Sequence, residues 1–144
     1  MKPTRGASKE RGAMLMELAL LLPLLVLIVM LVLEGSRLVR THQVLNNAAR
    51  EGARLSVQPE HQGNTADIAT EVVAYATQNG VPITAGAVTI DQGASIPTPS
   101  GVSMSASVVT VNYSYTVNYL SVFTWLGVPS TYALQGTAEF RNFY

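Results

Sequence analysis

A continuous apolar segment of twenty-one residues, from Ala13 to Leu33, constrains this chain more than any other feature. Its only ionisable side chain is that of Glu17. At ~1.5 Å of rise per residue, a helix of this length spans about 30 Å, close to the hydrocarbon thickness of a bilayer. A helix that is apolar on every face is unfavourable in water, so the segment is predicted to span a membrane.

Composition limits what the rest of the chain can be. The 144 residues suffice for one small domain in addition to the anchor. The formal net charge is zero and only 12% of the residues are charged, so no electrostatic attraction to nucleic acid is expected. The chain contains no cysteine, which excludes disulfide frameworks and thiolate metal sites.

The charges that flank the apolar segment predict its orientation. Residues 1–12 form a basic leader, in which a stable helix is not expected because proline and glycine recur. Its charges are Lys2, Arg5, Lys9 and Arg11, against Glu10. The positive-inside rule therefore places the N terminus in the cytoplasm and everything from Glu34 onward outside it. The segment is longer than the ~7–15-residue core of a secretory signal and lacks a small-x-small cleavage site, so a retained anchor at 13–33 is expected.

The helix is predicted to continue beyond the membrane over residues 34–57. Apolar and small residues recur there near helical spacing, and Gln58-Pro59 ends the pattern. The recurring residues are Leu38, Leu45, Ala48, Ala49, Gly52 and Leu55. Two i,i+3 charge pairs, Glu34 with Arg37 and Glu51 with Arg54, are each expected to contribute a few tenths of a kcal/mol.

Residues 58–144 are predicted to form a small outer α+β domain. A helix is expected from a cap at Asn64 or Thr65 to about Gln78. Strands are expected at 87–91, 103–118 and 131–141, with an exposed loop at 92–101 and a turn-like connection at 119–129. Neither face of the 103–118 strand is cleanly apolar, which indicates a bulge. Five aromatic residues are expected in the core of this domain, with an adhesive or subunit-binding surface as the alternative: Tyr113, Tyr115, Tyr119, Phe123 and Trp125.

Gly12-Ala13, with Glu17 five positions after the glycine, resembles the processing site of type IV prepilins and pseudopilins. The resemblance implies that a membrane-embedded prepilin peptidase cuts after Gly12 and releases the leader. Gly12 has no side chain to obstruct a protease. The freed α-amino group of Ala13, with a pKa of about 7.7–8.0, would be cationic and could pair with Glu17 of a neighbouring subunit. The alternative is a glutamate one turn inside a helix end that reaches back to the interface.

Further motifs extend over residues 11–55. They are Arg11-Gly12-Ala13, Glu17-Leu18-Ala19-Leu20, Leu22-Pro23-Leu24-Leu25, Glu34-Gly35-Ser36-Arg37, and Asn47-Ala48-Ala49-Arg50-Glu51-Gly52-Ala53-Arg54. Together they resemble the TadE-like family of tight-adherence pilus loci, although the family's usual Glu-Phe-Gly at the membrane exit is Glu34-Gly35-Ser36 here. The resemblance implies a non-enzymatic minor pseudopilin of the cytoplasmic membrane that helps to assemble or anchor a Tad (Flp) pilus. Its partners would be the prepilin peptidase and other pilins or pseudopilins.

The remaining candidates carry less information. Pro23 removes one backbone hydrogen bond from the membrane helix, which either eases packing between subunits or leaves a kink without a role. Glu34 and Arg37 are expected to be interfacial charges or contacts to a partner subunit. His42 and His61 have no third metal ligand nearby, and no nucleophile–base set or phosphate loop is present. No enzyme activity, cofactor, metal or small-molecule substrate is therefore expected.

The alternative function is an uncleaved single-pass envelope protein whose outer domain binds a ligand or a partner. The N terminus of the mature protein distinguishes the two interpretations.

Overall fold

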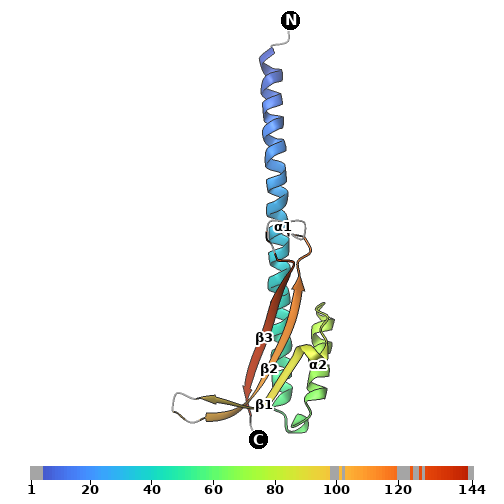
Figure 1. Cartoon of the computed structure of the whole chain (residues 1–144), viewed down its shortest axis with the longest axis vertical. Coiled ribbons are helices and arrows are strands. Elements are labelled where there is room, and N and C mark those ends of the chain that lie inside the picture. The colour runs from blue at the N-terminus through green and yellow to red at the C-terminus, as the bar shows by residue number, and fades with distance from the viewer. Residues whose placement is uncertain are drawn as a thin grey trace.

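The computed structural model describes residues 5–97, 101, 103–119, 124, 127 and 129–142, with the backbone alone for residues 5–11. The elements in chain order are helix α1 (Arg5–Ser56), the 3₁₀ turn η1 (Pro59–His61), helix α2 (Thr65–Gln78), the 3₁₀ turn η2 (Ala85–Ala87), and strands β1 (Val88–Pro97), β2 (Ser103–Thr116) and β3 (Thr131–Arg141). The first half of α1 projects as a rod from a small domain, which contains its second half, α2 and the sheet (Figure 1). The predicted α+β fold is confirmed.

Helix α1 is continuous over 52 residues, which corresponds to a length of about 78 Å. The predicted continuation beyond the apolar segment is confirmed, and the helix ends within two residues of the Gln58-Pro59 signal. Pro23 lies inside the helix without ending it. The expectation that the leader has no helix is wrong, because α1 begins at Arg5. Extending an existing helix adds a hydrogen bond per residue without a new nucleus, which outweighs the ~1 kcal/mol cost of a glycine.

Helix α2 matches its predicted bounds and is capped as expected. The Asn64 side chain accepts a hydrogen bond from the Asp67 backbone N–H (3.4 Å), and Gly80 (φ +83°) follows the helix in the left-handed region. Ile68, Val72 and Ala76 form its buried stripe. This stripe fixes the helix against α1 and the sheet.

The three strands form an antiparallel sheet in the order β1-β2-β3. The bounds of β3 agree with the prediction, whereas β1 is longer than expected and includes part of the segment predicted as a loop. The register between β1 and β2 shifts between Asp91 and Ala94, so the irregularity predicted for β2 lies in its partner strand instead. A bulge allows pairing to resume beyond a residue that does not fit the ladder, which is why the strand continues past Gln92.

Buried and half-buried polar side chains surround this bulge. The Gln92 Nε2 donates to the backbone carbonyls of Ser56 (3.1 Å) and His61 (3.0 Å), and its Oε1 accepts from the Gly63 N–H. Asn142 donates to the Gln92 carbonyl (2.9 Å) and accepts from the Ser107 hydroxyl (2.8 Å). These bonds connect the end of α1, the η1 turn and the two outer strands at the end of the domain away from the apolar rod.

The core lies between one face of the sheet and the two helices, which lie side by side (Figure 1). Its fully buried residues on α1 are Leu45, Ala48, Ala49 and Ala53, and those on β2 are Val109 and Val111. The small residues of α1 permit close contact. A Cβ at Gly136 of β3 would lie 2.5 Å from the backbone carbon of Leu45, so β3 rests directly on the α1 backbone. Glycine is required at this position.

Candidate functional site

The apolar half of α1 is not covered by any of the residues that the structure describes. Most of its large side chains from Met14 to Leu33 are exposed, with Leu20 as much as 78% exposed, while Leu27 and Met30 are half-buried. Among the described residues, the segment Gly12–Ser56 of α1 is long and apolar enough to cross a membrane. A core helix of a soluble protein would be covered, whereas this one is bare. It fits a single-pass membrane anchor.

The predicted processing residues lie on this bare rod. All three of Gly12, Ala13 and Glu17 are exposed; Gly12 and Ala13 are adjacent, and Glu17 lies about one turn farther along α1. Nothing lies within 4 Å of the position where a Cβ at Gly12 would stand. The Glu17 carboxylate has no hydrogen bond or ion pair to the described residues. Within one chain the structure therefore brings none of these residues together with Glu34 or Arg37.

Glu34, in contrast, is bound inside its own chain. Only 5% of this residue is exposed. Its Oε1 accepts a hydrogen bond from the Tyr115 hydroxyl (2.6 Å) and a longer one from the Asn118 N–H (3.4 Å), and its Oε2 accepts one from the Tyr119 N–H (2.8 Å). One carboxylate thus joins the outer end of the anchor to the end of β2. We call this set, Glu34 with Tyr115, Asn118 and Tyr119, the membrane-exit clamp.

Arg37 completes the surroundings of the clamp. Its guanidinium carbon lies 4.6 Å from the centre of the Tyr119 ring, a cation–π contact. The predicted ion pair between Glu34 and Arg37 is not formed among the described residues, because the backbone and Tyr115 occupy the carboxylate oxygens. The other predicted pair is present, with Arg54 Nη2 at 2.5 Å from Glu51 Oε1.

The clamp shifts the acidity of both of its ionisable groups. Burial raises the pKa of Glu34, but hydrogen bonds from Tyr115, Tyr119 and Asn118, together with the charge of Arg37, outweigh burial and leave the pKa lowered. Burial and the hydrogen bond to Glu34 raise the pKa of Tyr115 to about 12. Both shifts favour one state, a carboxylate that accepts from a neutral phenol.

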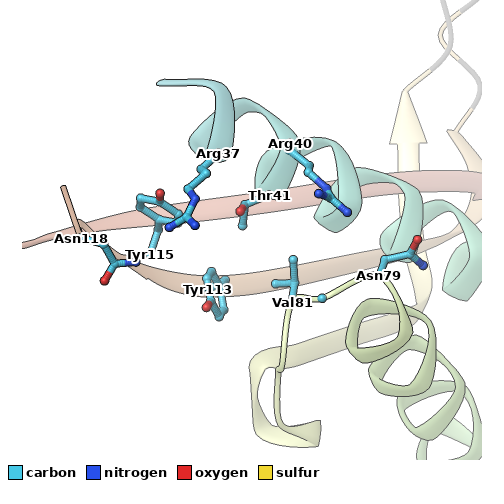
Figure 2. A pocket seen from close by; sticks show the side chains of 9 residues that line it. Arg37, Arg40, Thr41, Asn79, Val81, Tyr113, Tyr115 and Asn118 are labelled. Carbon is cyan, nitrogen blue, oxygen red and sulfur yellow. The ribbon is translucent and has the colours of Figure 1, made fainter. Parts of the chain in front are cut away.

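A groove opens beside the clamp, between α1, the end of α2 and β2 (Figure 2). Its volume is about 270 Å³. Its lining residues are Arg37, Arg40, Thr41, Asn79, Gly80, Val81, Tyr113, Tyr115 and Asn118. Among the described residues, no group of three or more histidine, aspartate or glutamate side chains is arranged to hold a metal ion.

Sequence reasoning located Glu34 and Arg37 but missed their partners. Tyr115 and Tyr119 are separated from Glu34 by 81 and 85 residues, and no periodicity links positions so far apart. The interpretation of the aromatic residues as core is confirmed for Tyr115, which is buried, while Tyr113 packs at the edge of the core. Phe123 and Trp125 lie outside the described residues. The alternation of residues along β2 placed Tyr115 on the same face as Val109 and Val111, and this alternation was the signal in the sequence that Tyr115 is buried.

These features define a class of protein, in which a single apolar helix fits a membrane anchor and continues into a small α+β domain. The family follows from the residues of that helix. Residues 12–54 match the family model described as TadE-like protein, which confirms the predicted resemblance to this family over that segment. Comparison with curated proteins and with solved structures found no match. The family match relates the chain to the Tad pilus.

Proposed function

We propose that this protein is a TadE-like minor pseudopilin, a non-enzymatic component that helps to assemble or anchor a Tad (Flp) pilus. The observation that carries the proposal is the bare rod of α1, which has one exposed carboxylate, Glu17, five positions after Gly12. A lone carboxylate in lipid is costly and is usually retained for a function. In an assembly, the helices of other pilins or pseudopilins cover the rod.

In this proposal residues 1–12 are a cytoplasmic leader, 13–33 span the cytoplasmic membrane, and 34–57 carry the helix to an extracytoplasmic domain at 58–144. The prepilin peptidase cuts after Gly12. A protease needs its substrate unwound, and glycine in a helix costs about 1 kcal/mol relative to alanine, so Gly12 eases the opening of α1 at that bond. The leader helix must open locally before cutting.

The freed amine of Ala13 and the Glu17 carboxylate of a neighbouring subunit then form an ion pair in a low-dielectric environment, where such a pair is stronger than in water. This pair sets the register between helices. Pro23 loosens one turn of the rod and eases its packing against neighbours. Glu34 and Arg37 hold the outer domain at a fixed angle to the anchor, so that the domain meets partner subunits in one orientation.

The N-terminal sequence of the protein from cells that contain the peptidase tests the processing step. We expect the mature chain to begin at Ala13, and Gly12→Leu to prevent cutting while Gly6→Leu, in the leader but away from the bond, does not. A start at Met1 in the unaltered protein would refute processing. It would favour an uncleaved envelope protein whose outer domain binds a ligand or partner, for which the groove beside the clamp is the candidate site.

Assembly needs a separate test. We expect Glu17→Ala to leave cutting intact and to reduce pilus formation about tenfold or more, whereas Met16→Leu, at a neighbouring position that is also exposed, leaves pilus formation unchanged. Equal piliation of the Glu17→Ala strain and the unaltered strain would refute the register role of this carboxylate.

A further inference from the structure

The groove beside the membrane-exit clamp has a chemistry that assembly does not use. Its floor is formed by Tyr113 and Tyr115 of β2, one side by Arg37 and Arg40 of α1, and the other by the turn after α2 (Figure 2). Figure 2 shows the side chains of both arginines on the groove side of α1. The groove is therefore a polar recess with two cations on one side.

The two cations outnumber the negative charge near the groove. None of the lining residues is acidic. Glu34 lies beside the groove, and its carboxylate offsets part of the charge of Arg37. Arg40 is exposed and has no ion pair or hydrogen bond to the described residues. The groove consequently has an excess of positive charge.

Three carbonyl groups at the C-terminal end of α2 already have donors, which weakens their effect on this charge. The Asn79 Nδ2 donates to the Tyr75 carbonyl (2.8 Å), the Gly80 N–H to that of Thr77 (3.0 Å), and the Val81 N–H to that of Ala76 (2.9 Å). Tyr113 adds a phenolic hydroxyl that makes no hydrogen bond to the described residues. The groove thus offers donors to an anion.

The distance of the groove from the hydrocarbon core of the bilayer indicates which kind of anion can reach it. At ~1.5 Å per residue, Arg37 and Arg40 lie about 6 and 10 Å beyond Leu33, the last residue of the apolar segment. The polar layer on each side of a ~30 Å hydrocarbon core is about 5–8 Å thick. Arg37 is therefore at the level of the lipid phosphates, and the long side chain of Arg40 can reach them from the margin.

We propose that this groove binds the phosphate of an anionic phospholipid headgroup, with Arg37 and Arg40 as its cationic ligands. Arginine suits phosphate because its planar fork donates two parallel hydrogen bonds. A volume of about 270 Å³ corresponds to roughly nine water molecules at ~30 Å³ each, enough for a glycerol phosphate headgroup while the acyl chains stay in the bilayer. The proposal needs only the membrane anchor, and it holds whether or not the chain is processed.

A lipid is favoured over the acidic segment of a partner because Arg37 lies within the headgroup layer, where lipid phosphates are always present at high local concentration, and the side chain of Arg40 reaches this layer from its margin. The bound headgroup also fixes the outer domain at the membrane surface, alongside the clamp.

The test is native mass spectrometry of the full chain in detergent, titrated with equal amounts of phosphatidylglycerol and phosphatidylcholine. We expect one phosphatidylglycerol to be retained preferentially, and Arg40→Gln to weaken its apparent affinity about tenfold, the effect of losing one charge-assisted hydrogen bond. The matched control is Arg50→Gln, an exposed arginine about 15 Å farther along the same helix, which should change nothing.

Equal retention of the two lipids, or equal retention of phosphatidylglycerol by the Arg40→Gln protein, would overturn the proposal. Free glycerol phosphate that displaces the lipid at equal concentration would assign the groove to a soluble phosphate instead. A photocrosslinker at position 40 that reacts in membranes with a partner protein and not with lipid would assign it to an acidic segment. Either result would overturn the lipid assignment.

Discussion

The membrane-exit clamp supports a prediction whose magnitude follows from its geometry. Removing the hydroxyl of Tyr115 by Tyr115→Phe deletes a 2.6 Å hydrogen bond to a buried carboxylate, and such a bond to a charged group contributes about 1.5–3 kcal/mol. Burial, and then the hydrogen bond to Glu34, raise the pKa of Tyr115 to about 12, so the phenol is a neutral donor at pH 7. We therefore expect Tyr115→Phe to remove about 2 kcal/mol from the free energy of unfolding of the outer domain.

A double-mutant cycle with Glu34→Gln isolates the interaction. The amide keeps the shape of Glu34 but removes its charge, so we expect a loss of about 2 kcal/mol for the single variant, because Tyr115 and Tyr119 both donate to a weaker acceptor. Once Tyr115 is phenylalanine, the same change should cost about 1 kcal/mol less, and this difference is the coupling energy. The assay is urea unfolding of the full chain in detergent micelles, followed by the near-ultraviolet circular dichroism of the tyrosines.

The matched control is Tyr132→Phe. Tyr132 is the cross-strand neighbour of Tyr115, but it is 40% exposed, so its hydroxyl should contribute less than about 0.5 kcal/mol. If the coupling energy between Glu34 and Tyr115 is below about 0.5 kcal/mol, the clamp does not exist as described. A loss for Tyr132→Phe equal to that for Tyr115→Phe would show that the assay reports general packing.

Three further predictions follow. The lowered pKa of Glu34 stabilises the domain above pH 4.5, the ordinary pKa of this group, and this contribution is lost as the pH falls through the folded value; the raised pKa of Tyr115 makes stability fall as the pH rises from 10 to about 12. The free energy of unfolding should depend less on pH in the acidic window for Glu34→Gln and in the alkaline window for Tyr115→Phe. An unchanged pH dependence would contradict the assignment. Gly136→Ala should cost about 1–3 kcal/mol because the new Cβ would meet the α1 backbone, while Gly35→Ala, with open space around it, should be neutral or stabilising. The measurement is the midpoint of urea unfolding for each variant, and equal effects would refute the close approach. Asn142→Ala should cost about 1–3 kcal/mol, since it leaves the buried Ser107 hydroxyl unpaired, and a loss below about 0.5 kcal/mol in the same assay would show that the network does not stabilise the domain.

Much of the fold was predictable because its signals are local. The bounds of α2 and β3 agree with the sequence pattern, since an asparagine cap, a terminal glycine and a run of strand-forming residues each act within a few positions. The end of β1 was predicted wrongly for the opposite reason. Gln92 continues the strand through hydrogen bonds to Ser56 and His61, which are far away in the chain.

The sequence by itself determined the anchor. Twenty-one residues with a single carboxylate leave no arrangement in water that hides them, so the apolar rod follows from hydrophobicity and length alone. The resemblance to the TadE-like family comes from the motifs in and around this segment. The tertiary structure decided what the charges at the membrane exit do. The sequence predicts that Glu34 is an interfacial charge paired with Arg37, yet Glu34 is buried and accepts hydrogen bonds from Tyr115 and Tyr119. Arg37 instead contacts the ring of Tyr119 and lines the groove. Only the packing of β2 on α1 supplies those donors. A buried carboxylate takes the strongest donors within reach, and which donors are within reach is a property of the fold.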